Sequence, residues 1–320
     1  MKLRWFAWLL VLLVAPALAQ TYPGKPVHII VPYAAGGGPD IQARQFGQKL
    51  SELIHQPVIV ENKVGAAGVI AAEYVAQASP DGYIFLLGSN THLIQKLLNP
   101  ALKFDPIADF APVTNVTSTP TVLVVRADYP AKTVQELIAL AKSKPGKLNY
   151  GSGGIGTSAH LAGATLVALE GLQAVHIPLK GSVEIAASLL RGDTDFAFPV
   201  SSTGVPQVKS GKLRALAVTA AKRMPELPGV PTLAEALKKD LYVQESWFGM
   251  WAPAKTPSTV LKAMHAQAIK ALGDPKLREQ FESQGAAVTT SESPEAFARF
   301  VKSENTKWAE IIKLTGAKAE

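Results

Sequence analysis

The sequence predicts an α/β protein built as two lobes. Short apolar runs of strand length alternate with segments of helical periodicity, and most of these runs open into a small polar loop. The succession of strand, glycine-rich loop and helix occurs twice, at 27–54 and at 148–169. Such alternation is typical of sheets covered by helices on both faces. We therefore expect two mostly parallel sheets flanked by helices, with a hinged cleft between them.

Composition excludes several classes of protein. The chain has 320 residues, of which 48% are hydrophobic, so one or two domains with ample cores are expected. It has no cysteine, which excludes disulfides and thiolate metal sites. The formal net charge is +7, but the basic residues are scattered, so the sequence indicates no nucleic-acid interface.

The N-terminal residues have the layout of a secretory signal peptide. Lys2 and Arg4 precede an apolar segment, 5–14, and small residues follow at Ala17 and Ala19. We expect cleavage after Ala19, so that 1–19 is the signal peptide and the mature chain is exported, to the periplasm in a Gram-negative cell. The alternative is an uncleaved membrane anchor, but the apolar segment is short for a span of about 20 residues.

The first predicted strand, 27–31, leads into a glycine-rich loop and then a helix. Pro39 suits the first turn of that helix, and the three glycines before it leave backbone N–H groups uncovered at a helix N-terminus. Anions bind at such places, and the loop itself holds no base or nucleophile. The predicted ligand-binding residues here are Tyr33, Gly36, Gly37, Gly38 and Asp40.

Two further strands are expected at 57–62 and 83–87, with a second glycine-bearing loop at 63–68. The polar stretch 88–92 follows the third strand as a predicted loop. Ligands of α/β sheets bind beyond the carboxyl ends of the strands. We therefore place Ser89, Asn90 and Thr91 in the ligand site, beside the first glycine loop.

The second half of the pattern has a strand at 121–125 and a helix at 134–143. A later strand leads into the loop 151–157, which lies before a helix at 158–169. Thr157 is the expected N-cap of that helix. The predicted ligand-binding residues of this loop are Ser152, Gly153, Gly154 and Thr157.

Histidines and one more serine complete the candidate site. His92 and His160 lie beside polar loops, where each either contacts the ligand or supports the loop; we include His160 among the ligand-binding residues. Ser201 begins a predicted polar loop, 201–204, after a strand at 196–199, and is included as well.

The chain is expected to cross between the lobes twice. Residues 20–120 and 244–320 form lobe 1, and residues 121–243 form lobe 2. Helices at 258–272, 275–284 and 294–314 return the chain to lobe 1. Two crossing segments make a hinge, and hinged lobes close around a ligand.

Two enzymatic interpretations have weak support. The loop 151–156 matches G-x-G-x-x-G, but the strand before it is only weakly apolar and the chain is expected to be exported, where nicotinamide cofactors are scarce. Ser152 with His160 suggests an exported hydrolase, but G-x-S-x-G is absent. The histidines occur singly, so we predict no metal site, no cofactor and no catalytic residue.

An ordered set of motifs along the chain resembles a known family. They lie at 23–27, 31–40, 60–68, 80–83, 150–157, 160–161, 211–219, 227–235, 247–249 and 252–253. Together they resemble the Bug family, the extracytoplasmic solute receptors of tripartite tricarboxylate transporters, over essentially the whole mature chain. The resemblance implies a two-lobed periplasmic binding protein fold (type II-like) that closes on a small carboxylate held by both glycine loops, partly through ordered water.

The first loop departs from the usual family pattern. Tyr33, Ala34, Ala35 and Pro39 stand where phenylalanine, two prolines and threonine are usual. Aromatic acids, nicotinate-like acids, amino acids and citrate-like acids all remain open as ligands.

The expected function is that of a monomeric periplasmic receptor that captures a small carboxylate and delivers it to the membrane permease subunits of a tripartite tricarboxylate transporter. Two alternatives stay open. One is the exported hydrolase that uses Ser152 and His160, and the other is a receptor that signals to a membrane sensor.

Overall fold

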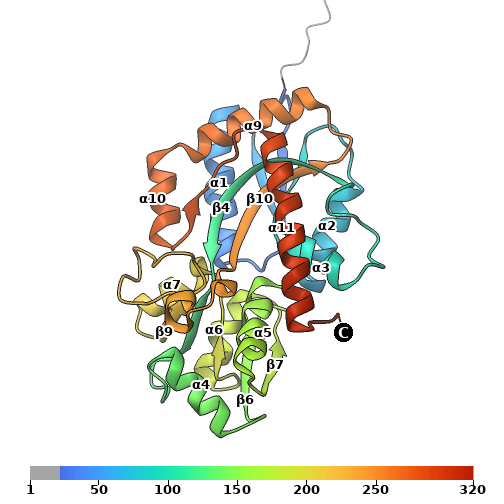
Figure 1. The fold of residues 1–320 in the computed structure, drawn as a ribbon. Helices are drawn as coiled ribbons and strands as arrows, with labels where there is room; N and C mark the ends of the chain where they lie inside the picture. Colours follow the sequence, from blue (N-terminus) through green and yellow to red (C-terminus); the bar gives the residue numbers. More distant parts are fainter. Residues whose placement is uncertain (1–21, 320) are drawn as a thin grey trace, which may run out of the picture.

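The computed structural model describes residues 22–319. The predicted signal peptide, 1–19, lies outside the described residues. Two separate sheets form two lobes, one above the other in Figure 1. Every helix within residues 22–319 is too short or too polar to span a bilayer.

Lobe 1 has six strands in the order β11-β4-β10-β3-β1-β2. Side chains alternate along β1, so that Ile29 and Val31 pack with α1, α9 and α10, whereas Ile30 packs on the other face with α2 and the start of α11. Helices therefore cover both faces of this sheet. The elements are β1 Val27–Val31, α1 Gly38–Ile54, β2 Val58–Asn62, α2 Val69–Ala76, β3 Ile84–Ser89, α3 Thr91–Leu98, β4 Phe110–Pro120, β10 Glu245–Pro253, α9 Ser258–Leu272, α10 Pro275–Ser283, β11 Ala287–Val288 and α11 Pro294–Thr315.

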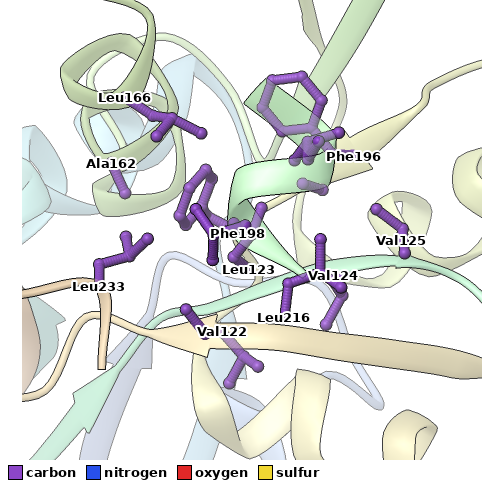
Figure 2. Packing of buried hydrophobic residues seen from close by; sticks show 14 of the residues in the cluster. Val122, Leu123, Val124, Val125, Ala162, Leu166, Phe196, Phe198, Leu216 and Leu233 are labelled. Carbon is purple, nitrogen blue, oxygen red and sulfur yellow. The ribbon is translucent and has the colours of Figure 1, made fainter. Parts of the chain in front are cut away.

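Lobe 2 has five strands in the order β7-β6-β8-β5-β9. Figure 2 shows its core, where side chains of β5 pack with Phe196, Phe198 and Leu216, and with Ala162 and Leu166 of α5. The elements are β5 Val122–Arg126, α4 Val134–Ser143, β6 Leu148–Ser152, α5 Ser158–Glu170, β7 Ala174–Pro178, α6 Ser182–Arg191, β8 Phe196–Ala197, α7 Ser201–Lys209, β9 Leu213–Val218 and α8 Leu233–Leu237.

The α/β class with two helix-flanked sheets is confirmed, but the expectation of mostly parallel sheets is wrong in detail. In lobe 1, β1 pairs parallel with β2 and β3, whereas β10 runs antiparallel to β3 and β4. In lobe 2, β5 runs antiparallel to β8 and β9. The reason is connectivity: β4 leaves lobe 1 and β10 returns to it, so two neighbouring strands must run in opposite directions.

Two predicted polar loops are regular structure instead. In the stretch 88–92, β3 extends to Ser89 and α3 begins at Thr91, because the Ser89 hydroxyl accepts from the Thr91 N–H (3.2 Å). In the stretch 201–204, α7 begins at Ser201. Its Gly204 packs so closely on Pro199 and Val122 that an added Cβ would lie 3.2 and 3.5 Å from them. Tertiary packing therefore outweighs the low helix propensity of Ser, Thr and Gly.

The two crossing segments are bound to each other. Glu245, at the start of β10, pairs with Pro120 at the end of β4. The Thr121 N–H donates to Thr219 Oγ1 (2.9 Å), and that hydroxyl donates to the Gln244 carbonyl (2.7 Å). The lobe limits given above, 20–120 with 244–320 and 121–243, stay a prediction.

The last helix bridges the lobes. α11 begins against lobe 1 and runs down the side of the molecule to lobe 2 (Figure 1). Trp308 and Ile311 of α11 form a buried apolar cluster with Ile94 of α3 and Leu161 of α5. The cluster thus joins elements of both lobes.

Candidate functional site

A cavity of about 750 Å³ lies between the two lobes. The first turns of five helices reach its wall, at Pro39 of α1, Val69 of α2, Thr91 of α3, Ser158 of α5 and Ser182 of α6. The first N–H groups of a helix have no partner within the helix, and they carry the positive end of its dipole. The cavity therefore offers a favourable environment to an anion from both lobes.

The first glycine loop is braced from outside the cavity by Asp40. Gly36 has φ +78°, a left-handed conformation suited to glycine. Its N–H donates to Asp40 Oδ2 (2.9 Å), and Asn62 Nδ2 donates to Asp40 Oδ1 (2.7 Å). Burial alone raises the pKa of Asp40, but hydrogen bonds from Arg44, Asn62 and Gly36 outweigh it, so its pKa is lowered. Asp40 thus holds the loop in shape as a buried carboxylate.

Replacing Asp40 with asparagine is expected to destabilise the fold at pH 7 by about 1–3 kcal/mol, because a buried charged acceptor is lost. A carboxyl with a lowered folded pKa stabilises the fold above its unfolded pKa, and this stability is lost as pH falls through the folded pKa. The difference between wild type and Asp40→Asn should therefore shrink as pH falls below about 4. Urea unfolding at a series of pH values measures it.

Asp193 provides the control for that variant. It pairs with Arg191 (2.7 Å), but both side chains are more than half exposed, so Asp193→Asn should change stability much less. A difference between wild type and Asp40→Asn that stays constant down to pH 3 would contradict the bracing role.

Gly37 and Gly38 lie where lobe 1 meets lobe 2. A Cβ added to Gly37 would lie 3.2 Å from Ser182 Oγ of α6. A Cβ added to Gly38 would lie 2.5 Å from Ser202 Oγ and 2.7 Å from the Ser202 carbonyl carbon of α7. These two glycines therefore allow the backbones of the lobes to approach each other, beside the cavity rather than on its wall.

Tyr33 forms part of the cavity wall. Its ring packs edge-on against Phe248 of β10 with centroids 5.3 Å apart. Its hydroxyl is buried without a hydrogen-bond partner, and burial raises the pKa of the phenol above its ordinary value. The phenol is thus neutral at pH 7, and its hydroxyl is covered by neighbouring atoms.

Ser89 and Thr91 also line the cavity, and Asn90 lies behind them. The Ser89 hydroxyl donates to Thr91 Oγ1 (2.9 Å). Asn90 is fully buried, and its Oδ1 accepts from Ser158 Oγ of lobe 2 (3.1 Å) and from Ser246 Oγ (3.2 Å). Asn90 therefore links the lobes.

Ser152 is a buried brace of the second glycine loop. Its hydroxyl donates to the Gly154 carbonyl (3.1 Å) and lies 2.7 Å from His176 Nε2. His160 stacks on His176 with centroids 4.1 Å apart, and its Nδ1 accepts from the Gly156 N–H (3.1 Å). Burial lowers the pKa of His160 to about 3, helped by the nearby His176, and burial lowers that of His176 to about 4. Both imidazoles are therefore neutral at pH 7.

This arrangement does not support the proposed nucleophile. Ser152 is fully buried and pairs with His176 instead of the expected His160. Its hydroxyl also bonds the Gly154 carbonyl and accepts from the Gly154 N–H (3.2 Å), so it is held within its own loop. The strand position of His176 gave no sign of this pairing in the sequence.

Six of the predicted site residues line the cavity, and eight lie behind or beside it. Ser201, for instance, is buried and donates to the Gly285 carbonyl (2.5 Å). Ligand contact by any of them stays a prediction. The six on the wall are Tyr33, Ser89, Thr91, Gly153, Gly154 and Thr157; the eight off it are Gly36, Gly37, Gly38, Asp40, Asn90, Ser152, His160 and Ser201.

The predicted site includes no residue from three parts of the wall. The segment 64–69 reaches it through a turn in which Ala66 and Ala67 both have positive φ, a strained conformation for alanine. The segment 178–182 brings the N-terminus of α6 to the wall, and His92 lies on it too. Gly65 and Gly68 precede α2, and Gly181 precedes α6, just as glycines precede α1 and α5. The same sequence pattern therefore indicates that these two segments belong to the site.

Comparisons with known proteins agree with this geometry. Residues 42–317 match the family described as the tripartite tricarboxylate transporter family receptor. The BugT protein of Bordetella pertussis is 32% identical over 306 residues, which cover 95% of this chain and 93% of that protein. The solved structure of Rpa4515 from R. palustris with adipate is 32% identical, has a TM-score of 0.89, and is matched over 93% of this chain and 99% of that one. MatC from Rhodopseudomonas palustris, with bound malate, is 29% identical with a TM-score of 0.85, over 91% of this chain and all of that one.

The two lobes and the cavity between helix N-termini define a periplasmic solute-binding receptor. The chain belongs to the receptor family of the tripartite tricarboxylate transporters, the Bug family. Members of this family are binding receptors and not enzymes, so the hydrolase interpretation is set aside.

Proposed function

We propose that this receptor captures a small carboxylate in the interlobe cavity and delivers it to the permease subunits of a tripartite transporter. The observation that carries the proposal is the convergence of five helix N-termini, from both lobes, on one cavity. Structural neighbours that hold adipate and malate support a carboxylate as the anion.

The mechanism is closure of the lobes about the hinge at 120–121 and 244–245. Several contacts between the lobes depend on closure. Gln95 Nε2 of α3 donates to the Ile155 carbonyl of lobe 2 (2.5 Å), and Ser158 Oγ donates to Asn90 Oδ1 (3.1 Å). A carboxylate between α1, α5 and α6 completes the contacts of both lobes, so it favours the closed form, whose surface the permease recognises.

Thermal unfolding of the mature protein with a panel of small carboxylates tests the proposal. A ligand at 100 times its Kd adds about 2.7 kcal/mol to stability, which raises the midpoint of unfolding by several degrees. We expect at least one carboxylate to do so, and matched neutral amides to have no effect. Mass spectrometry of denatured protein shows whether a ligand from the expression host is already bound. A ligand-free protein that no carboxylate stabilises would contradict the proposal.

Uptake measurements separate transport from signalling. Cells that lack the receptor should lose high-affinity uptake of the carboxylate identified in this way. Unchanged uptake, with a lost transcriptional response to that carboxylate, would favour a receptor that signals to a membrane sensor.

A further inference from the structure

Helix α3 meets the second glycine loop across the cleft. Gln95 of α3 lies on the cavity wall, and its Nε2 donates to the Ile155 carbonyl of lobe 2 (2.5 Å). In the part of the chain that the structure describes, no other protein group donates to this carbonyl. Gln95 therefore makes a polar contact that joins the lobes beside the ligand cavity.

Gly156 makes room for this contact. A Cβ added to Gly156 would lie 2.5 Å from Gln95 Nε2 and 2.9 Å from Leu98 Cδ1, so a larger residue would push α3 away from the loop. Its φ of +75° is a left-handed conformation that also favours glycine. The Gly156 N–H donates to His160 Nδ1 (3.1 Å), which holds the loop from behind. The loop is thus shaped to receive the end of the Gln95 side chain.

An apolar contact between the lobes lies next to the polar one. Ile94, which precedes Gln95 on α3, is fully buried in one cluster with Leu161 of α5. Trp308 and Ile311 of α11 complete this cluster. The packing holds α3 against lobe 2, so Gln95 reaches the loop without any rearrangement of its helix when the lobes are closed.

Opening of the lobes changes the surroundings of the Ile155 carbonyl. When the lobes separate, Gln95 and the carbonyl are both exposed to water, which replaces the hydrogen bond. In the closed form, a missing donor would leave the carbonyl facing α3 without its partner. The bond therefore stabilises the closed form alone, and with it any ligand that the closed form encloses.

On the basis of the receptor function proposed above, we propose that Gln95 is a positioning residue that sets the affinity of the receptor without selecting its ligand. It acts by holding the lobes closed over whichever carboxylate is bound. Its removal should therefore weaken the binding of different carboxylates by the same factor. A side chain that touches the ligand would discriminate among them.

The first test is calorimetry on Gln95→Met with the carboxylates that stabilise the wild type. Methionine keeps the length of the side chain and removes the donor. We expect each carboxylate to lose roughly tenfold in affinity, with losses that agree within about twofold. Losses that differ strongly between ligands would mean that Gln95 contacts the ligand, and would overturn the proposal, as would wild-type affinity throughout. A wild type that binds no carboxylate would instead overturn the receptor function itself.

Gln95→Glu provides a readout that a change in packing would not move. A carboxylate oxygen repels the Ile155 carbonyl, whereas a protonated carboxyl donates a hydrogen bond to it as the amide does. Such a bond raises the pKa of the introduced carboxyl, so binding should recover as pH falls. Relative to wild type at the same pH, we expect a loss of roughly tenfold or more at pH 7.5 that becomes at least about threefold smaller at pH 5. The loss in Gln95→Met should be the same at both pH values.

The titratable groups around this bond do not produce such a recovery. Burial lowers the pKa of His92 and His176 to about 4 and that of His160 to about 3, so all three are largely neutral at pH 5. Lys96 of α3 bonds backbone carbonyls of its own lobe. Charged groups on the neighbouring elements are the same in every variant, so their effects cancel in the ratio to wild type; they include Lys180, Glu304 and Lys307.

Gln135→Glu is the matched control. Gln135 of α4 also donates from Nε2 to a backbone carbonyl, that of Ala236 (2.8 Å), but both residues belong to lobe 2. This bond is the same in the open and closed forms, so the variant should bind carboxylates as wild type does at both pH values. A loss in Gln95→Glu that does not change with pH, or that Gln135→Glu shares, would overturn the assignment of Gln95 as the donor that holds the lobes closed.

Discussion

Replacing Gly38 with alanine is expected to weaken carboxylate binding by roughly tenfold or more. An added Cβ would lie 2.7 Å from the Ser202 carbonyl carbon, which is backbone and cannot rotate away. Helices α1 and α7 would have to separate. Overpacking of this kind costs about 1–3 kcal/mol, and this cost falls only on the closed form. Isothermal calorimetry with the best carboxylate of the thermal panel measures the effect.

Gly47→Ala on the same helix is the matched control. Its Cβ would meet Val60 (3.1 Å) and Val58 (3.3 Å), both in lobe 1, so any strain is the same in the open and closed forms. It should alter stability without altering affinity. Gly38→Ala, in contrast, should leave the stability of the ligand-free protein nearly unchanged. Wild-type affinity in Gly38→Ala would show that the approach of Gly38 to Ser202 is not part of the bound state.

Replacing Gly153 with valine is expected to reduce affinity by roughly a hundredfold, because the larger side chain would occupy space that the ligand needs. The Cβ would lie 3.4 Å from the Gly181 carbonyl carbon and from the Ser182 nitrogen, at the N-terminus of α6. The valine methyl groups extend further than the Cβ, into the space where we place the carboxylate. Because the φ of Gly153 is not positive, valine fits its backbone, and the variant should fold.

Gly229→Val tests whether the effect belongs to the site. Gly229 lies in lobe 2 with no atom within 4 Å of an added Cβ, and its φ is not positive either. It should bind as wild type does. Loss of binding in both variants, with both folded, would show that valine disturbs lobe 2 in general. It would contradict the placement of Gly153 in the binding site.

Local patterns predicted most of the strands, the long helices and the two glycine loops, but they did not predict β4 or β11. Helix α4 spans Val134–Ser143 and α9 spans Ser258–Leu272, as the periodicity indicates. The strand directions were not predictable in this way. They depend on which strands cross between lobes, and a local window does not contain that information.

The candidate site was predictable only where the chemistry is local. Gly153, Gly154 and Thr157 follow a strand and precede a helix, and they line the cavity. The sequence alone does not place His92 on the wall, because its position depends on packing against Trp251, far away in the sequence. Ser152 and His160 were selected for their side-chain chemistry, yet both lie behind the wall, where they bond to their own loop.

Closure of the lobes on a carboxylate is the central claim, and a distance between the lobes tests it most directly. The chain has no cysteine, so two spin labels can be attached uniquely, at Gln48→Cys on α1 and Leu190→Cys on α6, both exposed. Double electron–electron resonance should give a broad distribution without ligand, and a shorter, narrower one with saturating carboxylate. An unchanged distribution, while calorimetry shows that the carboxylate is bound, would contradict closure as the mechanism.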